Sequence, residues 1–143
     1  MEKNKSNIVG LPYKSVLIDL VKILEFIHDC GYLYRNIEPE HLMLNEDGQL
    51  VIIDFKRAKR YIDIKGYQVE VYDSIYTGSP FASNNQVRGL PESRKDDLES
   101  LGYLALLLFE MEIPWAGMNK DHVIKVRSSL TLQELFRSQT NWI

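Results

Sequence analysis

The stretch "SRKDDLESLGYLALLLFEMEIPWAGM", residues 93–118, decides the fold. Its middle, "LGYLALLLF" at 101–109, is apolar on nearly every side of a helix, a pattern typical of a helix buried on every side. The run is about half as long as a bilayer span requires, which excludes a membrane helix. The stretch therefore predicts a core helix from Asp96 to Met111 that Pro114 ends.

The segments on either side of this helix predict a small number of further elements. Apolar residues recur at three- and four-residue steps from Ser15 to Ile27, which predicts an amphipathic helix. The segment "HLMLNEDGQLVIIDF", residues 41–55, predicts a β-hairpin, because its two apolar halves flank an Asp-Gly turn. Residues 56–95 have little periodicity and are expected to be mostly loop, whereas residues 130–136 carry a weak helical pattern.

Composition and charge indicate one globular domain inside the cell. The chain has 143 residues, of which 45% are apolar and 26% charged, as expected for a single packed domain. A net charge of −3 gives no chain-wide attraction for nucleic acid or anionic lipid. Cys30 is the one cysteine, expected to be buried or half-buried, and no secretory signal is visible, so a cytoplasmic or nuclear location is expected.

The order of the predicted elements resembles the C-terminal lobe of a protein kinase. Residues 93–118, together with "TGSPFAS" at 77–83, resemble the casein kinase I family, including its vaccinia-related members. That family carries a similar Arg-Asp-Asp-Leu-Glu-Ser-Leu-Gly run followed by Leu-Pro-Trp. The resemblance implies a mainly α fold with a small β-hairpin, built as a truncated kinase-like C-lobe over residues 13–143. Residues 1–12 are expected to form a polar tail. The N-terminal lobe and the terminal helices of a kinase are expected to be missing.

The stretch "YRNIEPEH", residues 34–41, stands where the family has its catalytic loop. The family loop reads His-Arg-Asp, with Lys two residues and Asn five residues after the Asp. The corresponding positions here are vestigial in this interpretation, and they are Tyr34, Arg35, Asn36, Glu38 and His41. The amide of Asn36 has no basic site at neutral pH, Glu38 places a negative charge near a transferring phosphate, and His41 offers nitrogen where magnesium prefers oxygen.

The metal-binding Asp of the family is kept as Asp54, but Lys56 replaces the glycine two residues on. The chain shows neither a glycine-rich phosphate loop nor the strand lysine that grips the nucleotide. These departures predict a pseudokinase rather than an enzyme, with no catalytic residue, no metal and no cofactor. A transition-metal site of His41, Asp54 and His28 is disfavoured, because no two of the histidines have a short ligand spacing.

Several residues that match the family are expected to be structural. The resemblance implies that Asp97 reaches the backbone of the catalytic loop and that Arg35 organises neighbouring segments. Gly102 and Trp115 belong to the same set. The frame of the family is thus kept where its reactive groups are replaced.

Two surface features are candidate interaction sites. Four basic residues gather between residues 56 and 60, namely Lys56, Arg57, Lys59 and Arg60, and three tyrosines lie in the segment where the family has its activation loop, namely Tyr67, Tyr72 and Tyr76. A solvated loop and ordinary packing are the competing interpretations. Because half a kinase fold exposes apolar surface, we expect a protein partner and a role as an interaction or structural subunit. The alternatives are a split kinase completed by another chain and an RNA- or ribosome-associated factor that uses the basic residues.

Overall fold

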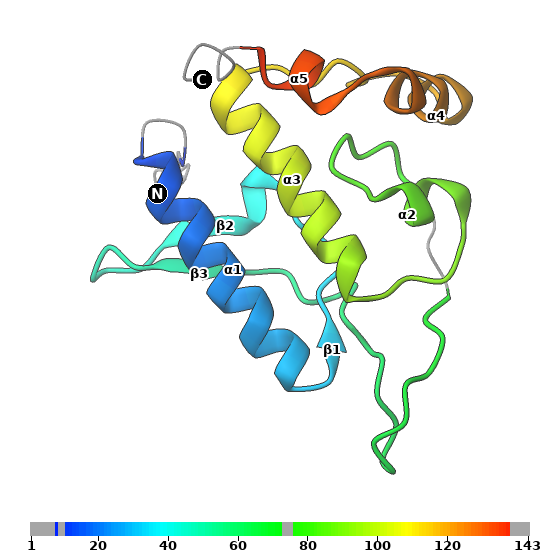
Figure 1. The fold of residues 1–143 in the computed structure, drawn as a ribbon. Coiled ribbons are helices and arrows are strands. Elements are labelled where there is room, and N and C mark those ends of the chain that lie inside the picture. The colour runs from blue at the N-terminus through cyan, green and yellow to red at the C-terminus, as the bar shows by residue number, and fades with distance from the viewer. Residues whose placement is uncertain (1–7, 9–10, 73–75, 138–143) are drawn as a thin grey trace.

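The computed structural model describes residues 8, 11–72 and 76–137, and it is mostly helical with two small antiparallel sheets (Figure 1). The helices are α1 (Tyr13–Asp29), α2 (Asn84–Arg88), α3 (Arg94–Glu110), α4 (Lys120–Ser129), α5 (Leu132–Leu135) and the 3-10 helix η1 (Pro39–His41). The strands are β1 (Tyr32–Leu33), β2 (Leu42–Leu44), β3 (Leu50–Ile52) and β4 (Lys59–Arg60).

Helices α1 and α3 pack side by side and form the centre of the fold (Figure 1). The predicted amphipathic helix is confirmed as α1, whose buried face carries Val16, Leu20, Leu24 and Ile27. These side chains join Leu104 and Leu108 of α3 in the main core. Ile8, from the predicted polar tail, is buried in the same core.

The predicted core helix is present as α3, but two details of the prediction are wrong. Helix α3 ends at Glu110, because Met111 adopts a left-handed conformation with φ 60°, so Pro114 does not end it. It is also not buried on every side, since Leu98 is 50% exposed. At its start Ser93 and Asp96 form a capping box, which fixes the first turn.

The predicted hairpin is confirmed as β2 and β3, in which Leu42 pairs with Ile52 and Leu44 with Leu50. The side chain of Asn45 accepts hydrogen bonds from the backbone of Asp47 and Gln49 and so closes the turn. The second sheet, in which β1 pairs with β4, was not predicted from the sequence. It also missed α2, so residues 56–95 are not entirely loop.

A second core lies beside α3 and involves the C-terminal helices. Trp115 is buried there with Val87, Leu106 and Val123, and its indole nitrogen donates to the carbonyl oxygen of Pro80 at 2.8 Å. Helix α4 was not predicted, because its residues are mostly polar and only Val123 is fully buried. The weak pattern at 130–136 contains α5.

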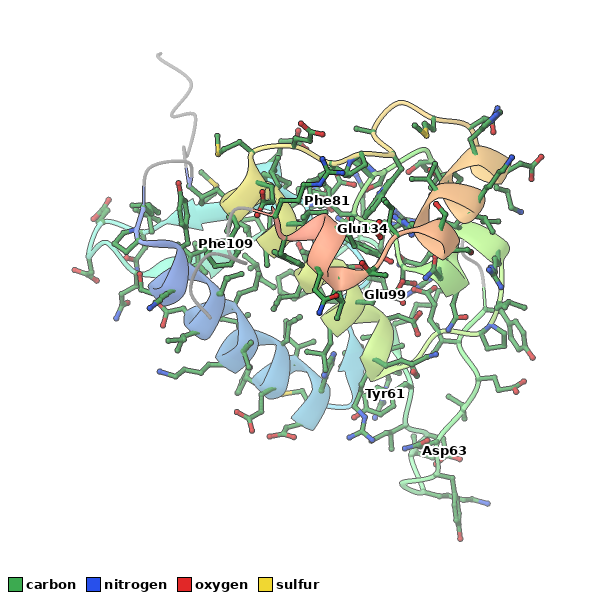
Figure 2. The ribbon with its side chains drawn as sticks, turned by 45° about the horizontal axis from the view of Figure 1, so that its top comes forward. Tyr61, Asp63, Phe81, Glu99, Phe109 and Glu134 are labelled. Carbon is green, nitrogen blue, oxygen red and sulfur yellow. The ribbon has the colours of Figure 1, made fainter. Side chains whose placement is uncertain are left out.

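The segment between β4 and α2 extends away from the helices. Figure 2 shows Asp63 near the far end of this segment, beyond Tyr61, which packs close to the start of α3. Asp63 closes the turn by accepting hydrogen bonds from the backbone of Lys65 and Tyr67. No helix among the described residues is long and apolar enough to cross a membrane.

Candidate functional site

The buried carboxylate of Asp97 holds the backbone at the catalytic-loop position. Asp97, on α3, accepts hydrogen bonds from the backbone nitrogens of Tyr34 and Arg35 at 2.9 and 2.7 Å. The Nε2 atom of His28, at the end of α1, lies 2.7 Å from the same carboxylate. All four residues are buried, so the loop, α1 and α3 are joined at one point.

Arg35 holds the loop from the other side. Its backbone has a positive φ of 65°, a conformation that a non-glycine residue adopts only when its surroundings enforce it. The guanidinium forms a buried ion pair with Glu92 at 2.8 Å and donates to the carbonyl oxygen of Arg57 at 3.1 Å. Arg35 therefore ties the loop to the segment before α3 and to the segment after the hairpin.

Tyr34 is buried under the same region. Its hydroxyl donates to the carbonyl oxygen of Ile53 at 2.6 Å, and its ring meets the ring of Phe55 edge-on. Burial, with smaller contributions from the carboxylates of Asp54 and Asp97, raises the pKa of Tyr34 above its ordinary value. Tyr34 is thus a neutral hydrogen-bond donor at neutral pH, and it supports the backbone next to Asp54.

The side chains that face the site come together around Asp54. The side-chain amide nitrogen of Asn36 donates to the backbone carbonyl oxygen of Asp54 at 3.1 Å. The backbone carbonyl oxygen of Asn36 lies 2.8 Å from Nδ1 of His41. The carboxylate of Asp54 lies 3.1 Å from the Nζ atom of Lys56 and 3.4 Å from Nε2 of His41. The hydrogen bond from Lys56, aided by the charge of His41, holds the pKa of Asp54 below its usual range.

The magnesium ion that kinase chemistry uses does not fit this set of groups. Magnesium requires near-octahedral oxygen coordination, whereas His41 presents an imidazole nitrogen and the Asp54 carboxylate is paired with the ammonium of Lys56. Among the described residues, no cluster of three or more His, Cys, Asp or Glu side chains is placed to hold a metal ion. His28, the third member of the disfavoured metal set, contacts Asp97 instead.

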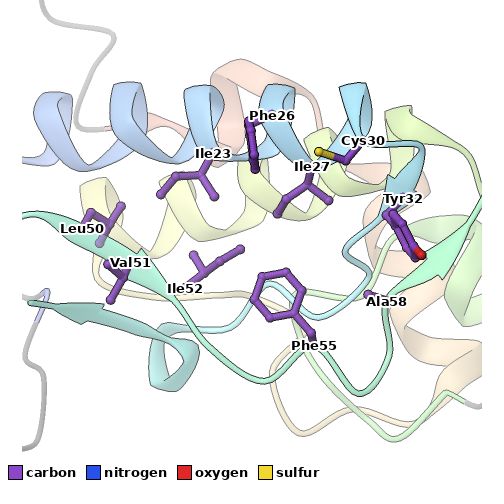
Figure 3. A pocket seen from close by; sticks show the side chains of 10 residues that line it. All are labelled: Ile23, Phe26, Ile27, Cys30, Tyr32, Leu50, Val51, Ile52, Phe55 and Ala58. Carbon is purple, nitrogen blue, oxygen red and sulfur yellow. The ribbon is translucent and has the colours of Figure 1, made fainter.

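An apolar pocket lies beside this site. It has a volume of about 590 Å³, and its side chains come from α1 on one side and from β3, Phe55 and Ala58 on the other (Figure 3). Phe26 is 70% exposed and Phe55 is 50% exposed. Cys30 is also exposed at the pocket, so the expectation that it is buried or half-buried is wrong. The pocket was not predicted from the sequence. A signal for it exists, because Phe26 is a large apolar residue that lies outside the buried face of α1.

The remaining candidate residues are dispersed. Glu38 is half-buried at the start of η1, and Gly102 has open space where a Cβ would lie, so no close approach explains this glycine. Among the basic residues, Lys56 pairs with Asp54 and Arg60 stacks on the ring of Tyr32. Two of the four basic residues thus make contacts within the chain, and a shared interaction surface stays a prediction.

The three tyrosines of the activation-loop segment also separate. Tyr67 and Tyr72 are exposed, whereas Tyr76 is partly buried against the second core. The structure thus leaves Tyr67 and Tyr72 accessible to a partner and gives Tyr76 a packing contact.

Comparison with known proteins assigns the class. The family described as "Protein kinase domain" matches residues 3–142, so the chain belongs to the protein kinase domain family. Within that family it is similar to a probable casein kinase I homolog of Encephalitozoon cuniculi, with 38% identity over 98 residues, which are 67% of this chain and 31% of that protein. The chain thus spans about a third of the length of this curated relative. The resemblance to casein kinase I is confirmed.

This membership corrects one expectation. The prediction that the chain is not an enzyme is wrong, because both matches point to a family of kinase enzymes. The prediction assumed that replacing the reactive side chains of the family's catalytic loop abolishes kinase activity. Loss of a general base lowers a rate by about 10² to 10⁴, while phosphoryl transfer depends mainly on positioning and charge neutralisation.

Proposed function

We propose that this chain is the large-lobe part of a casein kinase I-type kinase and that it works by binding a kinase-type small lobe in its apolar pocket. The observation that carries the proposal is the pocket itself, with Phe26 and Phe55 exposed at its walls. An exposed cavity lined by aliphatic and aromatic side chains is typical of a protein or ligand binding site. The order of the elements, with α3 at the centre, supports the large-lobe assignment.

The position of the pocket connects partner binding to the catalytic region. Phe55 lines the pocket and follows Asp54 directly, and its ring contacts Tyr34. A small lobe seated on Phe55 would therefore lie next to Asp54 and bring phosphate-binding groups to it. In this arrangement the chain supplies the acceptor side of the site and the partner supplies the nucleotide side.

The test is the mass of the native assembly, determined by size-exclusion chromatography with light scattering on protein from its own cells. We expect the wild type to elute with a small lobe that carries a glycine-rich loop and a strand lysine. Phe26→Asp should elute without it, because the substitution places a charge in the apolar pocket. Leu132→Asp is the matched control, since Leu132 is an exposed leucine on α5, outside this pocket. A Phe26→Asp variant that stays in the assembly would contradict the proposal.

Phosphoryl transfer by the completed assembly is a second candidate function, favoured by the membership of the chain in the protein kinase domain family. The amide of Asn36 has no basic site that could take the proton of a hydroxyl nucleophile. We therefore expect Asn36→Asp to raise the rate of the assembly by a factor within the range of about 10² to 10⁴. An unchanged rate, with intact assembly, would argue against this function.

Binding of RNA through residues 56–60 stays a prediction with less support, because Lys56 and Arg60 are engaged within the chain. It predicts binding that weakens steeply as salt is added.

A further inference from the structure

A groove of about 730 Å³ lies between the end of α1, the start of α3 and the segment that follows β4. It shares no lining residue with the apolar pocket described above. Val21 and Leu98, which are each about half exposed, form an apolar strip in this groove. Two acidic side chains from α1 and two basic side chains from α3 also line it, namely Glu25, Asp29, Arg94 and Lys95.

His28 lines the same groove, and its side chain is only 9% exposed. Its Nε2 atom lies 2.7 Å from the Asp97 carboxylate. A carboxylate accepts hydrogen bonds, so Nε2 carries the hydrogen and Nδ1 of the neutral ring presents a lone pair. The two ring nitrogens point in different directions, so Nδ1 faces away from Asp97. Within the described ranges Nδ1 has no hydrogen-bond partner. Because buried acceptors are normally satisfied, the groove offers a hydrogen-bond donor a place to bind.

Three of the four charged side chains stand at helix ends where they oppose the helix dipole. Asp29 is the last residue of α1, where the dipole favours a cation, and Arg94 and Lys95 begin α3, where it favours an anion. None of the four forms an ion pair with another residue of the described part of the chain. Opposite charges thus line one groove without neutralising each other. Such departures from a local rule are expected at functional sites.

We propose that this groove binds a small apolar zwitterion of the dipeptide class, with its ammonium group on the α1 side and its carboxylate on the α3 side. An ammonium group has three hydrogens to donate, and His28, Glu25 and Asp29 supply the acceptors. Arg94 and Lys95 supply positive charge for the carboxylate. The apolar strip between α1 and α3 receives the side chains of the ligand. The inference does not depend on the small lobe proposed above.

The experiment titrates the full chain, with isotope-labelled histidine nitrogens, with the dipeptide leucyl-leucine at about pH 7, where a peptide amino group is mostly protonated. We expect a saturable shift of the Nδ1 signal of His28, because the ammonium group donates to this atom. Two analogues separate the charges: the N-acetyl dipeptide lacks the ammonium group, and the dipeptide amide lacks the carboxylate. Each should bind at least about tenfold more weakly, since a hydrogen bond to a charged group contributes that much.

Two variants test the two sides of the groove. Asp29→Asn should weaken binding of leucyl-leucine several-fold without lowering the stability of the chain, because it removes a charge that the dipole of α1 disfavours. Lys95→Gln should weaken binding of the dipeptide but not of its amide, which has no carboxylate. The matched control is Asp47→Asn, an exposed aspartate in the turn of the β2–β3 hairpin, which should bind as the wild type does.

The free chain provides one way to overturn the proposal. A His28 ring with its hydrogen on Nδ1 and none on Nε2 would leave no lone pair for a ligand. A His28 signal that does not respond to leucyl-leucine would also overturn it and assign the groove to water. Equal binding of the dipeptide and its N-acetyl analogue would show that no ammonium group is recognised, which would overturn it as well.

Discussion

Asp97 and Asp54 lie on two sides of the same loop, and the protein holds them in different ways. Asp97 is buried and binds two backbone nitrogens and His28. Asp54 lies at the half-exposed rim and binds one flexible lysine and, more distantly, His41. The hydrogen-bond partners of Asp97 are buried within the fold. Lys56, which pairs with Asp54, is exposed, so water is able to replace it. The loop is thus held by buried contacts next to α3 and by more exposed contacts next to Asp54.

The largest effect should come from removing the buried carboxylate. Asp97→Ala leaves His28 and the backbone nitrogens of Tyr34 and Arg35 buried without their acceptor. Breaking a buried, hydrogen-bonded charge in this way costs about 3–5 kcal/mol of unfolding free energy. Urea denaturation followed by circular dichroism measures the loss.

The control for this variant is Asp19→Ala, an exposed aspartate on α1. A surface substitution of this kind should change the unfolding free energy by no more than about 0.5 kcal/mol. Equal stability of the two variants would show that the hydrogen bonds of Asp97 do not hold the loop.

A smaller effect separates the two faces of α1. Leu24 is fully buried in the main core, whereas Phe26, two residues on, is 70% exposed at the apolar pocket. Leu24→Ala should lower the unfolding free energy by about 2–5 kcal/mol because it leaves a cavity. Phe26→Ala should change it by about 0.5 kcal/mol.

Thermal and urea unfolding of the isolated chain compare the two variants directly. A large destabilisation by Phe26→Ala would mean that the ring of Phe26 packs within the fold, and the pocket would then be no binding surface. The pair thus sharpens the distinction between a face that the fold needs and a face left for a partner.

The sequence predicts the elements that have strong periodicity and misses those that depend on distant contacts. Helix α1 and the β2–β3 hairpin follow from local patterns, since each has its own apolar repeat or turn signal. Strands β1 and β4 are two residues each and form only because Tyr32 and Arg60 meet in the folded chain. The contact between His41 and Asp54 likewise depends on tertiary structure, because the two residues belong to different segments. The left-handed backbone at Met111 explains why α3 ends before Pro114.

The smallest effect concerns Asp54, the more exposed of the two carboxylates. The hydrogen bond from Lys56 lowers the pKa of Asp54, so the ionised form is favoured in the folded protein. A lowered pKa stabilises the fold above the unfolded value of about 3.9 and loses that contribution as the pH falls through the folded pKa. Carboxyl NMR titration should therefore place the pKa of Asp54 below this value. Lys56→Met should raise it, and added salt should weaken the shift because Lys56 is exposed. An unchanged pKa in Lys56→Met would show that Lys56 does not hold this carboxylate, and the contrast with Asp97 would then rest on burial alone.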